Sequence, residues 1–503
     1  MTLRLAGLHR PTAVAAGSLA ALALLALALF RTGGPPAPGG REAGLTVHCA
    51  AGLQPPVEAL AREYERRYGV PVRLQYGGSG SLLAALSVKP AGDLYVAGDA
   101  SYVERARGRG LVAEVLPLAA MRPVIGVRRG NPHGIAGPDD LLREGLRVGL
   151  AHPEAAAVGR ITREALGQSG HWDALERRAL VQKPTVNELA VDLELGALDA
   201  AVIWDATAAQ FGGVEAVRAP ALDGFRQTVT LGVLRSSAEP AAALRLARFL
   251  SSADVGAPRF AAAGYEPAGG DPWDEAPELV VMSGAMLSPA VEETLREFEE
   301  REGVRVTRVY NGCGILVSQM LAGQMPDAYF SCDRSFLERV ADRFGEPREL
   351  SANRLGLLVE RGNPLGLRGP QDLLREGLRV GLGHPEKSAL GELTRRLLSE
   401  AGVYGRLHEA GNCAVESPTG DFLVNQMRAG ALDAAVVYRS NAALVAEHLE
   451  FLPLAGEGAV AVQPLAIASG SRRGELARRL FAALGSGESR RRFESLGFEW
   501  KGE

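Results

Sequence analysis

The chain has 503 residues, of which 47% are hydrophobic and 23% charged, so it is long enough for several globular domains with ordinary apolar cores. Its 55 basic and 59 acidic residues give a formal net charge of −4. Proteins that bind nucleic acids usually carry an excess of basic residues, so we expect no nucleic-acid partner. Four cysteines against 61 glycines exclude a disulfide framework and indicate many tight turns.

The first 44 residues predict an export signal or a membrane anchor followed by a Pro/Gly-rich linker. Basic residues precede Thr12–Phe30, which is a run of 19 uncharged, mostly apolar residues. No A-x-A cleavage site follows the run, which slightly favours a retained anchor over a cleaved signal. We expect the rest of the chain to be exported, either periplasmic or held at the outer face of the inner membrane.

From residue 45 onward, predicted strands and helices alternate. Leu45–Cys49 is a strand, the helix after QPP is closed by Gly69, and Val70–Tyr76 is a second strand. The glycine loop GGSGS leads to a helix near Leu82, and Asp93–Ala97 is a third strand. This β-α-β-α-β order predicts a parallel sheet with right-handed crossovers.

The second half of the chain shows the same order of elements. Leu279–Met282 is the first strand, Pro289–Glu302 the helix and Val304–Tyr310 the second strand. The glycine loop is now NGCGI, and Asp327–Ser331 is the third strand. The two halves therefore have the same predicted fold class, α/β.

An internal repeat explains this agreement. Residues 129–154 and 361–386 are identical at 21 of 26 positions without a gap, so one module is the unit to be explained. A polar Pro/Gly segment separates the copies. The predicted organisation is a signal or anchor with linker at 1–44, a first module at 45–268, a linker at 269–278 and a second module at 279–503.

Each module is expected to divide into two lobes. Extended segments at 124–128 and 228–234, matched by 355–360 and 459–467, predict two chain crossings between lobes, so one lobe is discontinuous. Strand ends and helix N-termini would face the cleft between the lobes. Such a cleft suits an oxyanion, because backbone N–H groups and helix dipoles supply partial positive charge without a formal cation.

Five motifs occur in the same order in both halves. The first half has CAAGLQPPVEAL, YGGSGSLLAAL, GDLYVAGD, HPEAAAVGRITREAL and LGALDAAVIWDATA, and the second has SGAMLSPAVEETL, YNGCGILVSQM, PDAYFSCD, HPEKSALGELTRRLL and AGALDAAVVYRSNA. In order and spacing, these motifs resemble the periplasmic molybdate-binding proteins of ABC importers, within the type 2 periplasmic-binding fold. The resemblance implies two tandem type 2 modules, each with two α/β lobes and a ligand cleft between them.

The resemblance also implies a ligand set of hydroxyls and main-chain amides around a tetrahedral oxyanion. Carried over to the first module, the ligand-binding positions are Gly52, Ser79, Val158, Val186 and Trp204, with Ser79 as the leading candidate. Gly52 stands where the family has serine, and Trp204 where it has tyrosine. Gly52 still offers its amide and Trp204 its indole N–H, so anion binding is still expected.

The second module departs from the family differently. Its ligand-binding positions are Met286, Cys313, Leu390, Gly420 and Tyr438, so sulfur replaces oxygen at both hydroxyl positions while the tyrosine is retained. Asp205, next to Trp204 in the first module, corresponds to Arg439 in the second. This change of charge sign means that the two clefts need not bind the same ligand.

The sulfur atoms of the second module allow three interpretations. Cys332 follows the third strand of this module and is expected near Cys313. The residues are either ordinary packing, a Cys313–Cys332 disulfide, or, with Met286, a soft-metal site that would favour Cu(I) or zinc. No metal ligand set is firm from the sequence alone.

Two further repeated motifs favour structural roles. The His-Pro-Glu sequences at 152–154 and 384–386 lack neighbours that would complete a metal set, which favours a role in a turn. Asp199 and Asp433 precede an apolar strand in the sequence LDAAV, which favours a loop or cap role over catalysis.

No enzyme is predicted, because the sequence has no G-x-S-x-G, H-E-x-x-H or paired CxxC motif, and we expect neither catalytic residues nor a cofactor. The predicted function is capture of a small, molybdate-like oxyanion outside the cytoplasm for an ABC permease. The alternatives are a membrane-anchored sensory or scaffold protein with degenerate clefts, and soft-metal binding by the second module.

Overall fold

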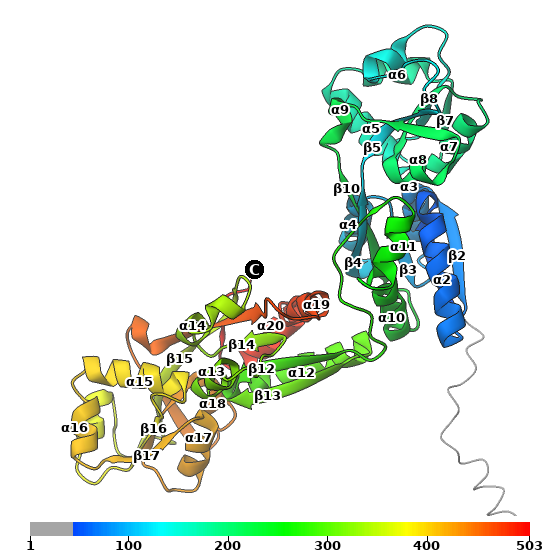
Figure 1. The fold of residues 1–503 in the computed structure, drawn as a ribbon. Coiled ribbons are helices and arrows are strands. Elements are labelled where there is room, and N and C mark those ends of the chain that lie inside the picture. Colours follow the sequence, from blue (N-terminus) through cyan, green and yellow to red (C-terminus); the bar gives the residue numbers. More distant parts are fainter. Residues whose placement is uncertain (1–43, 503) are drawn as a thin grey trace, which may run out of the picture.

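The structure, a computed structural model, describes residues 44–502, so the predicted signal or anchor lies outside the described residues. Between residues 44 and 502, no helix is both long enough and apolar enough to cross a membrane. Figure 1 shows two α/β bodies that follow one another along the chain, the first coloured blue to green and the second green to red.

The first body is built from residues of the first copy of the repeat. Its strands are β1 (Leu45–Ala50), β2 (Val72–Gly77), β3 (Leu94–Ala97), β4 (Val112–Met121), β5 (Pro123–Arg128), β6 (Val148–Ala151), β7 (Val181–Lys183), β8 (Ala200–Trp204), β9 (Val214–Val217), β10 (Gln227–Leu234) and β11 (Glu266–Pro267). Its helices are η1 (Ala51–Leu53), α2 (Gln54–Tyr68), α3 (Ser79–Val88), α4 (Ala100–Gly108), η2 (Pro138–Leu142), α5 (Ala157–Gln168), α6 (Trp172–Arg178), α7 (Val186–Glu194), α8 (Asp205–Gln210), α9 (Pro220–Asp223), α10 (Pro240–Ser251) and α11 (Gly256–Ala262).

The second body contains the second copy. Its strands are β12 (Glu278–Gly284), β13 (Arg305–Asn311), β14 (Ala328–Phe330), β15 (Arg348–Glu360), β16 (Val380–Gly383), β17 (Cys413–Ser417), β18 (Ala434–Tyr438), β19 (Leu449–Pro453), β20 (Val460–Ile467) and β21 (Glu499–Trp500). Its helices are η3 (Ala285–Leu287), α12 (Ser288–Glu302), α13 (Cys313–Leu321), α14 (Arg334–Glu338), η4 (Ala341–Arg343), η5 (Pro370–Leu374), α15 (Ala389–Glu400), α16 (Tyr404–Glu409), α17 (Gly420–Arg428), α18 (Arg439–Ala443), η6 (Glu457–Ala459), α19 (Gly474–Leu484) and α20 (Gly487–Ser495).

Each body has two lobes with matching sheet topology. The lobes of the first have strand orders β11-β4-β10-β3-β1-β2 and β7-β6-β8-β5-β9. In the second, β13-β12-β14-β20-β15 and β17-β16-β18-β15-β19 repeat these orders, and the long strand β15 runs through both lobes. The strands β1, β2 and β3 are parallel, as predicted, and β10 pairs antiparallel to β3. The prediction of two tandem modules, each with two α/β lobes, is confirmed.

Local sequence signals set the ends of the helices beside the clefts. Helices α2 and α12 each carry proline in the first turn and end at a glycine with positive φ, Gly69 at 65° and Gly303 at 64°. Helix α3 begins at Ser79, three residues before the predicted Leu82, because Gly78 is its N-cap and the loop sequence SGS forms its first turn. The glycine loop is therefore the N-terminus of a helix.

The two modules meet around a buried ion cluster. Glu302 of α12 is 1% exposed and accepts hydrogen bonds from Arg248 of the first module at 3.0 Å and from Arg479 of the second at 2.6 Å. At the edge of this contact, Arg301 makes a two-bond pair with Glu114, at 2.8 and 3.0 Å. Charged groups thus join the modules at a buried contact.

The segment between the modules is packed against both of them. Trp273 donates its indole N–H to the Tyr68 hydroxyl at 2.9 Å and stacks edge-on against Phe249 of the first module. The carboxylate of Asp271 accepts hydrogen bonds from the amides of Glu475 and Leu476, both at 2.9 Å, at the start of α19 in the second module. This segment therefore restricts how the modules are oriented.

A repeated ion pair confirms the structural role predicted for Asp199 and Asp433. Asp199 is 4% exposed and accepts two side-chain hydrogen bonds from Arg147, at 2.6 and 3.1 Å, together with the Arg147 amide at 2.9 Å. Asp433 and Arg379 make the same bonds in the second module. The Arg147 guanidinium lowers the pKa of Asp199 to about 2 from its ordinary value of 3.8.

We expect the Asp199→Asn variant to be less stable than the parent at neutral pH by about 1–2 kcal/mol. This value is lower than for a fully buried ion pair, because Arg147 is half exposed and solvent screens its charge. A carboxylate whose folded-state pKa is lowered stabilises the protein above its unfolded-state pKa and ceases to do so as the pH falls through the folded-state value. The gap between parent and variant should therefore close from about pH 4 to pH 2. Urea denaturation over that range measures this, and a constant gap would contradict the ion-pair explanation.

Candidate ligand clefts

A small cavity lies between the two lobes of the first module. Within this cavity, the volume that the centre of a water molecule can occupy is ≈ 20 Å³. A cavity of this size suits an ion of a few atoms. All five positions predicted for this module line it, namely Gly52, Ser79, Val158, Val186 and Trp204, together with Gly78, Gly98 and Met121 of one lobe and Ala156, Ala157 and Thr185 of the other. No charged side chain belongs to this lining.

Helix N-termini from both lobes converge on the cavity. Ser79 is the first residue of α3, Val158 the second of α5 and Val186 the first of α7. The first amides of a helix have no carbonyl partner within it, and the N-cap residues Gly78 and Ala156 provide no side-chain acceptor. The positive ends of three helix dipoles therefore face the cavity, while some first-turn amides are already paired: those of Gly80 and Ser81 donate to the Ala155 carbonyl, and that of Glu188 donates to the Thr185 hydroxyl.

The side chain of Ser79 is held in place for donation. Its Oγ is buried and accepts the Gly98 amide at 3.1 Å, while the Ser79 carbonyl accepts the hydroxyl of Tyr95 at 2.7 Å. Because the Oγ accepts from Gly98, its own O–H is directed to another acceptor, and the cavity is the adjacent space.

The lobes are closed over this cavity. The amides of Gly80 and Ser81 donate across the cleft to the Ala155 carbonyl, at 2.8 and 3.3 Å. A Cβ on Gly78 would lie 2.3 Å from this carbonyl oxygen, and one on Gly80 would lie 1.9 Å from that of Glu154. The glycine loop thus has a second role, since only glycine allows the two backbones to approach this closely.

The glycine at position 52 also has a steric cause. A Cβ there would lie 3.0 Å from Val186 Cγ1 and 3.6 Å from Thr207 Oγ1, a hydroxyl oxygen that is buried without a hydrogen-bond partner among the described residues. Below it, the hydroxyl of Tyr265 donates to the Gly52 carbonyl and fixes this turn. A serine side chain would be crowded here, so the main-chain amide is the group that position 52 offers.

Comparison with known proteins is consistent with a cleft of this kind. The sequence model of a family described as bacterial extracellular solute-binding protein matches residues 45–266 and again 279–499. The chain belongs to this solute-binding protein family. A Haemophilus influenzae protein described as a binding protein is 32% identical over 229 residues, covering 45% of this chain and 93% of its own length.

Two relatives with more specific descriptions cover one module each. The molybdate-binding protein ModA of Mycobacterium bovis is 28% identical over 237 residues, which are 46% of this chain and 87% of that protein. The structure of the Azotobacter vinelandii periplasmic molybdate-binding protein covers 44% of this chain and 98% of its own, with 18% identity and a TM-score of 0.39. The family model matches the chain twice, so the solute-binding module is present in two copies, and the family implies export from the cytoplasm.

The second cleft of this solute-binding protein is filled by side chains at positions that are glycine in the first. Aligning DLYVAGD with DAYFSCD places Cys332 at the position of Gly98, and Met286 stands at that of Gly52. The Cys332 amide donates to Cys313 Sγ at 3.2 Å, as the Gly98 amide does to Ser79 Oγ. Cys332 therefore adds a thiol where the first cleft has space.

The predicted proximity of Cys313 and Cys332 is confirmed. Their sulfur atoms lie 3.2 and 2.0 Å from the point that a Cβ on Gly284 would occupy, and both residues are free thiols. Burial opposes ionisation of Cys313, but hydrogen bonds from the Cys332 thiol and amide outweigh it and lower the pKa of Cys313. The same pairing, together with burial, raises the pKa of Cys332. The sulfur of Met286 lies 3.9 Å from the side-chain nitrogen Nδ2 of Asn353.

The other predicted positions of the second cleft are buried but lie in different surroundings. Leu390 is the second residue of α15, whose N-cap Ser388 accepts the Gly391 amide at 3.3 Å, whereas the matching N-cap in the first module is alanine. Gly420 begins α17, and the Tyr438 hydroxyl has no hydrogen-bond partner within residues 44–502. The N-terminus of α15 is thus capped where that of α5 is not, whereas Thr185 caps α7 in the first module and Thr419 makes no such bond to α17 in the second.

Acceptor groups also enter the second cleft. The Asp421 carboxylate accepts the Asn441 side-chain amide at 2.8 Å, and burial raises the pKa of Asp421. Asn353, which occupies the position of Met121, has a buried Oδ1 that lacks a partner in the described part of the chain. Asp421 and Asn353 stand where the first module has Asn187 and Met121, so a carboxylate replaces an amide and an amide replaces a thioether in the second module.

The remaining sequence motifs have structural roles. His152 Nδ1 accepts the Glu154 amide at 3.2 Å, and His384 accepts that of Glu386 at the same distance, which confirms the turn role of both His-Pro-Glu motifs. Asp205 accepts the Arg122 amide at 3.0 Å, where the chain crosses between the lobes.

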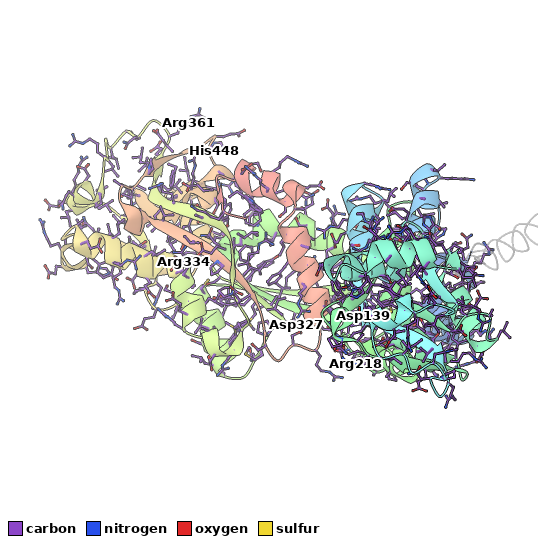
Figure 2. The ribbon with its side chains drawn as sticks, turned by 90° about the horizontal axis from the view of Figure 1, so that it is seen from above. Asp139, Arg218, Asp327, Arg334, Arg361 and His448 are labelled. Carbon is purple, nitrogen blue, oxygen red and sulfur yellow. The ribbon has the colours of Figure 1, made fainter. Side chains whose placement is uncertain are left out.

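A larger open pocket of ≈ 800 Å³ lies beside the linker, away from both clefts. Figure 2 labels Asp327 of this pocket on the side of the second module that is nearer the first. The Asp327 carboxylate accepts hydrogen bonds from the Val280 amide at 2.8 Å and from the Ser471 hydroxyl at 2.6 Å. In the same pocket, Arg473 forms an ion pair with Asp274. The charges of this pocket serve the junction between the modules.

Sequence reasoning missed two pairs of positions that distinguish the clefts. These are Gly98 against Cys332, and the N-caps Ala156 against Ser388. Both could have been found by aligning the repeats column by column and asking which substitutions add a side chain or a helix cap. The signal was present in GDLYVAGD against PDAYFSCD and in AAAVG against KSALG.

Proposed function

We propose that the first module binds a small tetrahedral oxyanion of the molybdate type. The observation that carries this proposal is the convergence of three helix N-termini on a closed, uncharged cavity of ionic size. Gly52, Ser79, Val158, Val186 and Trp204 would hold the anion through main-chain amides, one hydroxyl and the indole N–H. Similarity to the Mycobacterium bovis molybdate-binding protein supports this choice.

The donor-rich wall favours an anion that carries no proton. A protonated oxyanion needs an acceptor for its O–H, whereas the helix amides and the Ser79 hydroxyl donate. Molybdate, tungstate and sulfate are fully deprotonated at neutral pH, but phosphate is partly protonated. We therefore expect phosphate to bind more weakly than the other three anions.

For the second module we propose a scaffold role without oxyanion binding. Met286 and Cys332 occupy positions that are glycine in the first cleft, Ser388 caps a helix end, and the Asp421 carboxylate lies nearby. Soft-metal binding by Cys313, Cys332 and Met286 is the alternative for this cleft, and it is supported by the proximity of the two cysteine sulfur atoms.

In the cell, we propose that modules 45–268 and 279–503 act outside the cytoplasm and that the first delivers its anion to an ABC permease. The N-terminal segment would serve for export and, if it is retained, as an anchor in the inner membrane. Mass spectrometry of the mature N-terminus tests this, because a start between residues 34 and 44 would eliminate the anchor.

The test of the binding site is calorimetry of the intact chain with molybdate, tungstate, sulfate and phosphate. We expect Ser79→Ala to weaken molybdate binding by about 10- to 100-fold, since a hydrogen bond to a charged group contributes roughly 1.5–3 kcal/mol. The matched control is Cys313→Ala at the equivalent position of the second module, which should leave the affinity unchanged. No heat with any of the four anions would reject the proposal.

A further inference from the structure

Three potential metal ligands come together on the second module, away from its cleft. His408 belongs to α16, and Cys413 and Glu416 belong to β17, the edge strand of the sheet (Figure 1). One ligand atom from each side chain lies within 4.8 Å of the other two. Imidazole, thiolate and carboxylate are the ligand types that zinc takes in proteins.

A β-bulge places Cys413 and Glu416 on the same side of the strand. Residues three apart on a regular strand face opposite sides. Here Val380 pairs with Cys413 but Gly381 pairs with Val415, so Ala414 is an extra residue. Cys413 and Glu416 then lie opposite residues two apart on β16, and their side chains share one face.

The imidazole of His408 is oriented as in a metal site. Its Nδ1 lies 2.9 Å from the carbonyl of Tyr404, which can only accept, so Nδ1 carries a proton and a neutral ring has its lone pair on Nε2. Nε2 lies 3.2 Å from Glu416 Oε1, which also accepts the hydroxyl of Tyr404 at 3.1 Å. Two lone pairs at this distance require a cation between them, either a proton or a metal ion.

The first module lacks this arrangement. Gln182 pairs with Leu150 as Glu416 pairs with Leu382 in the repeated strand, so the carboxylate is replaced by an amide. Glu176 stands at the place of His408, and the shorter connection that follows contains no cysteine. The ligand set belongs to the second module alone, together with the longer connection and its bulge.

We propose that His408, Cys413 and Glu416 bind one divalent transition-metal ion of the zinc class, with water as a fourth ligand. On binding, the S–H bond of Cys413 breaks, its proton passes to solvent and a metal–thiolate bond forms. The bound ion would fasten α16 to the edge strand.

The experiment is titration of the intact chain with Zn²⁺ against a competing chelator, in a reducing buffer without oxyanion. We expect the parent chain to bind one equivalent of Zn²⁺. Loss of an outer-shell partner typically lowers metal affinity by roughly 10- to 100-fold. The variants Cys413→Ser, His408→Gln and Glu416→Gln each remove a direct ligand, so their Zn²⁺ affinity should fall by more than that. Substitution with Co²⁺ should give a thiolate charge-transfer band that is absent from Cys413→Ser. The double variant Cys313→Ala/Cys332→Ala is the control and should keep both signals.

The proposal is overturned if the parent chain binds no Zn²⁺ more tightly than the chelator, or if Cys413→Ser binds as the parent does. It is equally overturned if the equivalent disappears in the Cys313/Cys332 variant, because the ion would then lie in the second cleft. None of these results bears on oxyanion binding, which calorimetry measures separately.

Discussion

Replacing Gly98 by cysteine is expected to abolish oxyanion binding by the first module while the fold is retained. A Cβ at this position would lie 3.2 Å from the flexible end of Met121, 3.6 Å from Ala157 and 3.8 Å from Ser79 Oγ, so the backbone accommodates it with a small movement of Met121. The thiol beyond the Cβ would enter the cavity, in which the centre of a water molecule has only ≈ 20 Å³ of free space. The substitution recreates Cys332 of the second module.

Calorimetry with molybdate and thermal unfolding, both in reducing buffer, measure this effect. The matched control is Gly108→Cys at the end of α4, where a Cβ would meet nothing within 4 Å, and it should bind as the parent does. Full affinity in folded Gly98→Cys protein would show that the anion does not occupy this cavity.

The Glu302→Gln variant is expected to lose about 3–5 kcal/mol of stability, the typical cost of removing one partner from a buried ion pair. Glu302 is 1% exposed and is the shared acceptor of Arg248 and Arg479, which are 9% and 11% exposed. Without the carboxylate, Arg248 and Arg479 lose the acidic group that they share at the contact between the modules, and the charges of Asp271 and Glu475 still act on Arg479. An amide of the same shape cannot compensate for this.

Chemical denaturation followed by tryptophan fluorescence tests the expectation, with the midpoints of all transitions compared because two modules need not unfold in one step. Glu300→Gln on the same helix is the control, since Glu300 is 66% exposed in its pair with Arg296 and should change stability by no more than about 1 kcal/mol. Equal losses in both variants would contradict a special role for the buried cluster.

The sequence was sufficient to predict the tandem fold because the information is repeated. The order of strands, glycine loops and helices occurs twice, and the five positions given by the motif set, Gly52, Ser79, Val158, Val186 and Trp204, all line one cavity. These positions lie at strand ends and helix starts, where local patterns carry the most information.

What the sequence did not reveal depends on contacts between distant segments. The crowding at Gly52 arises from Val186 and Thr207, and the hydroxyl beneath it comes from Tyr265, 213 residues away. Neither neighbour can be inferred from the segment around residue 52.

The ligand set around Cys413 was missed for a different reason. The regular strand period places Cys413 and Glu416 on opposite faces, and only the bulge at Ala414 brings them together. His408 then reaches them from the preceding helix, and the length of the turn at 410–412 determines this approach.

The difference between the two clefts is tested most directly by the crystal structure of the intact chain grown with tungstate, with tungsten located by anomalous scattering. We predict one tungsten peak per chain, in the first cleft. The oxygens of this tungstate should accept hydrogen bonds from Ser79 Oγ and from the amides of Val158 and Val186. A tungsten peak beside Cys313 in the second cleft, or no peak in the first, would contradict this account.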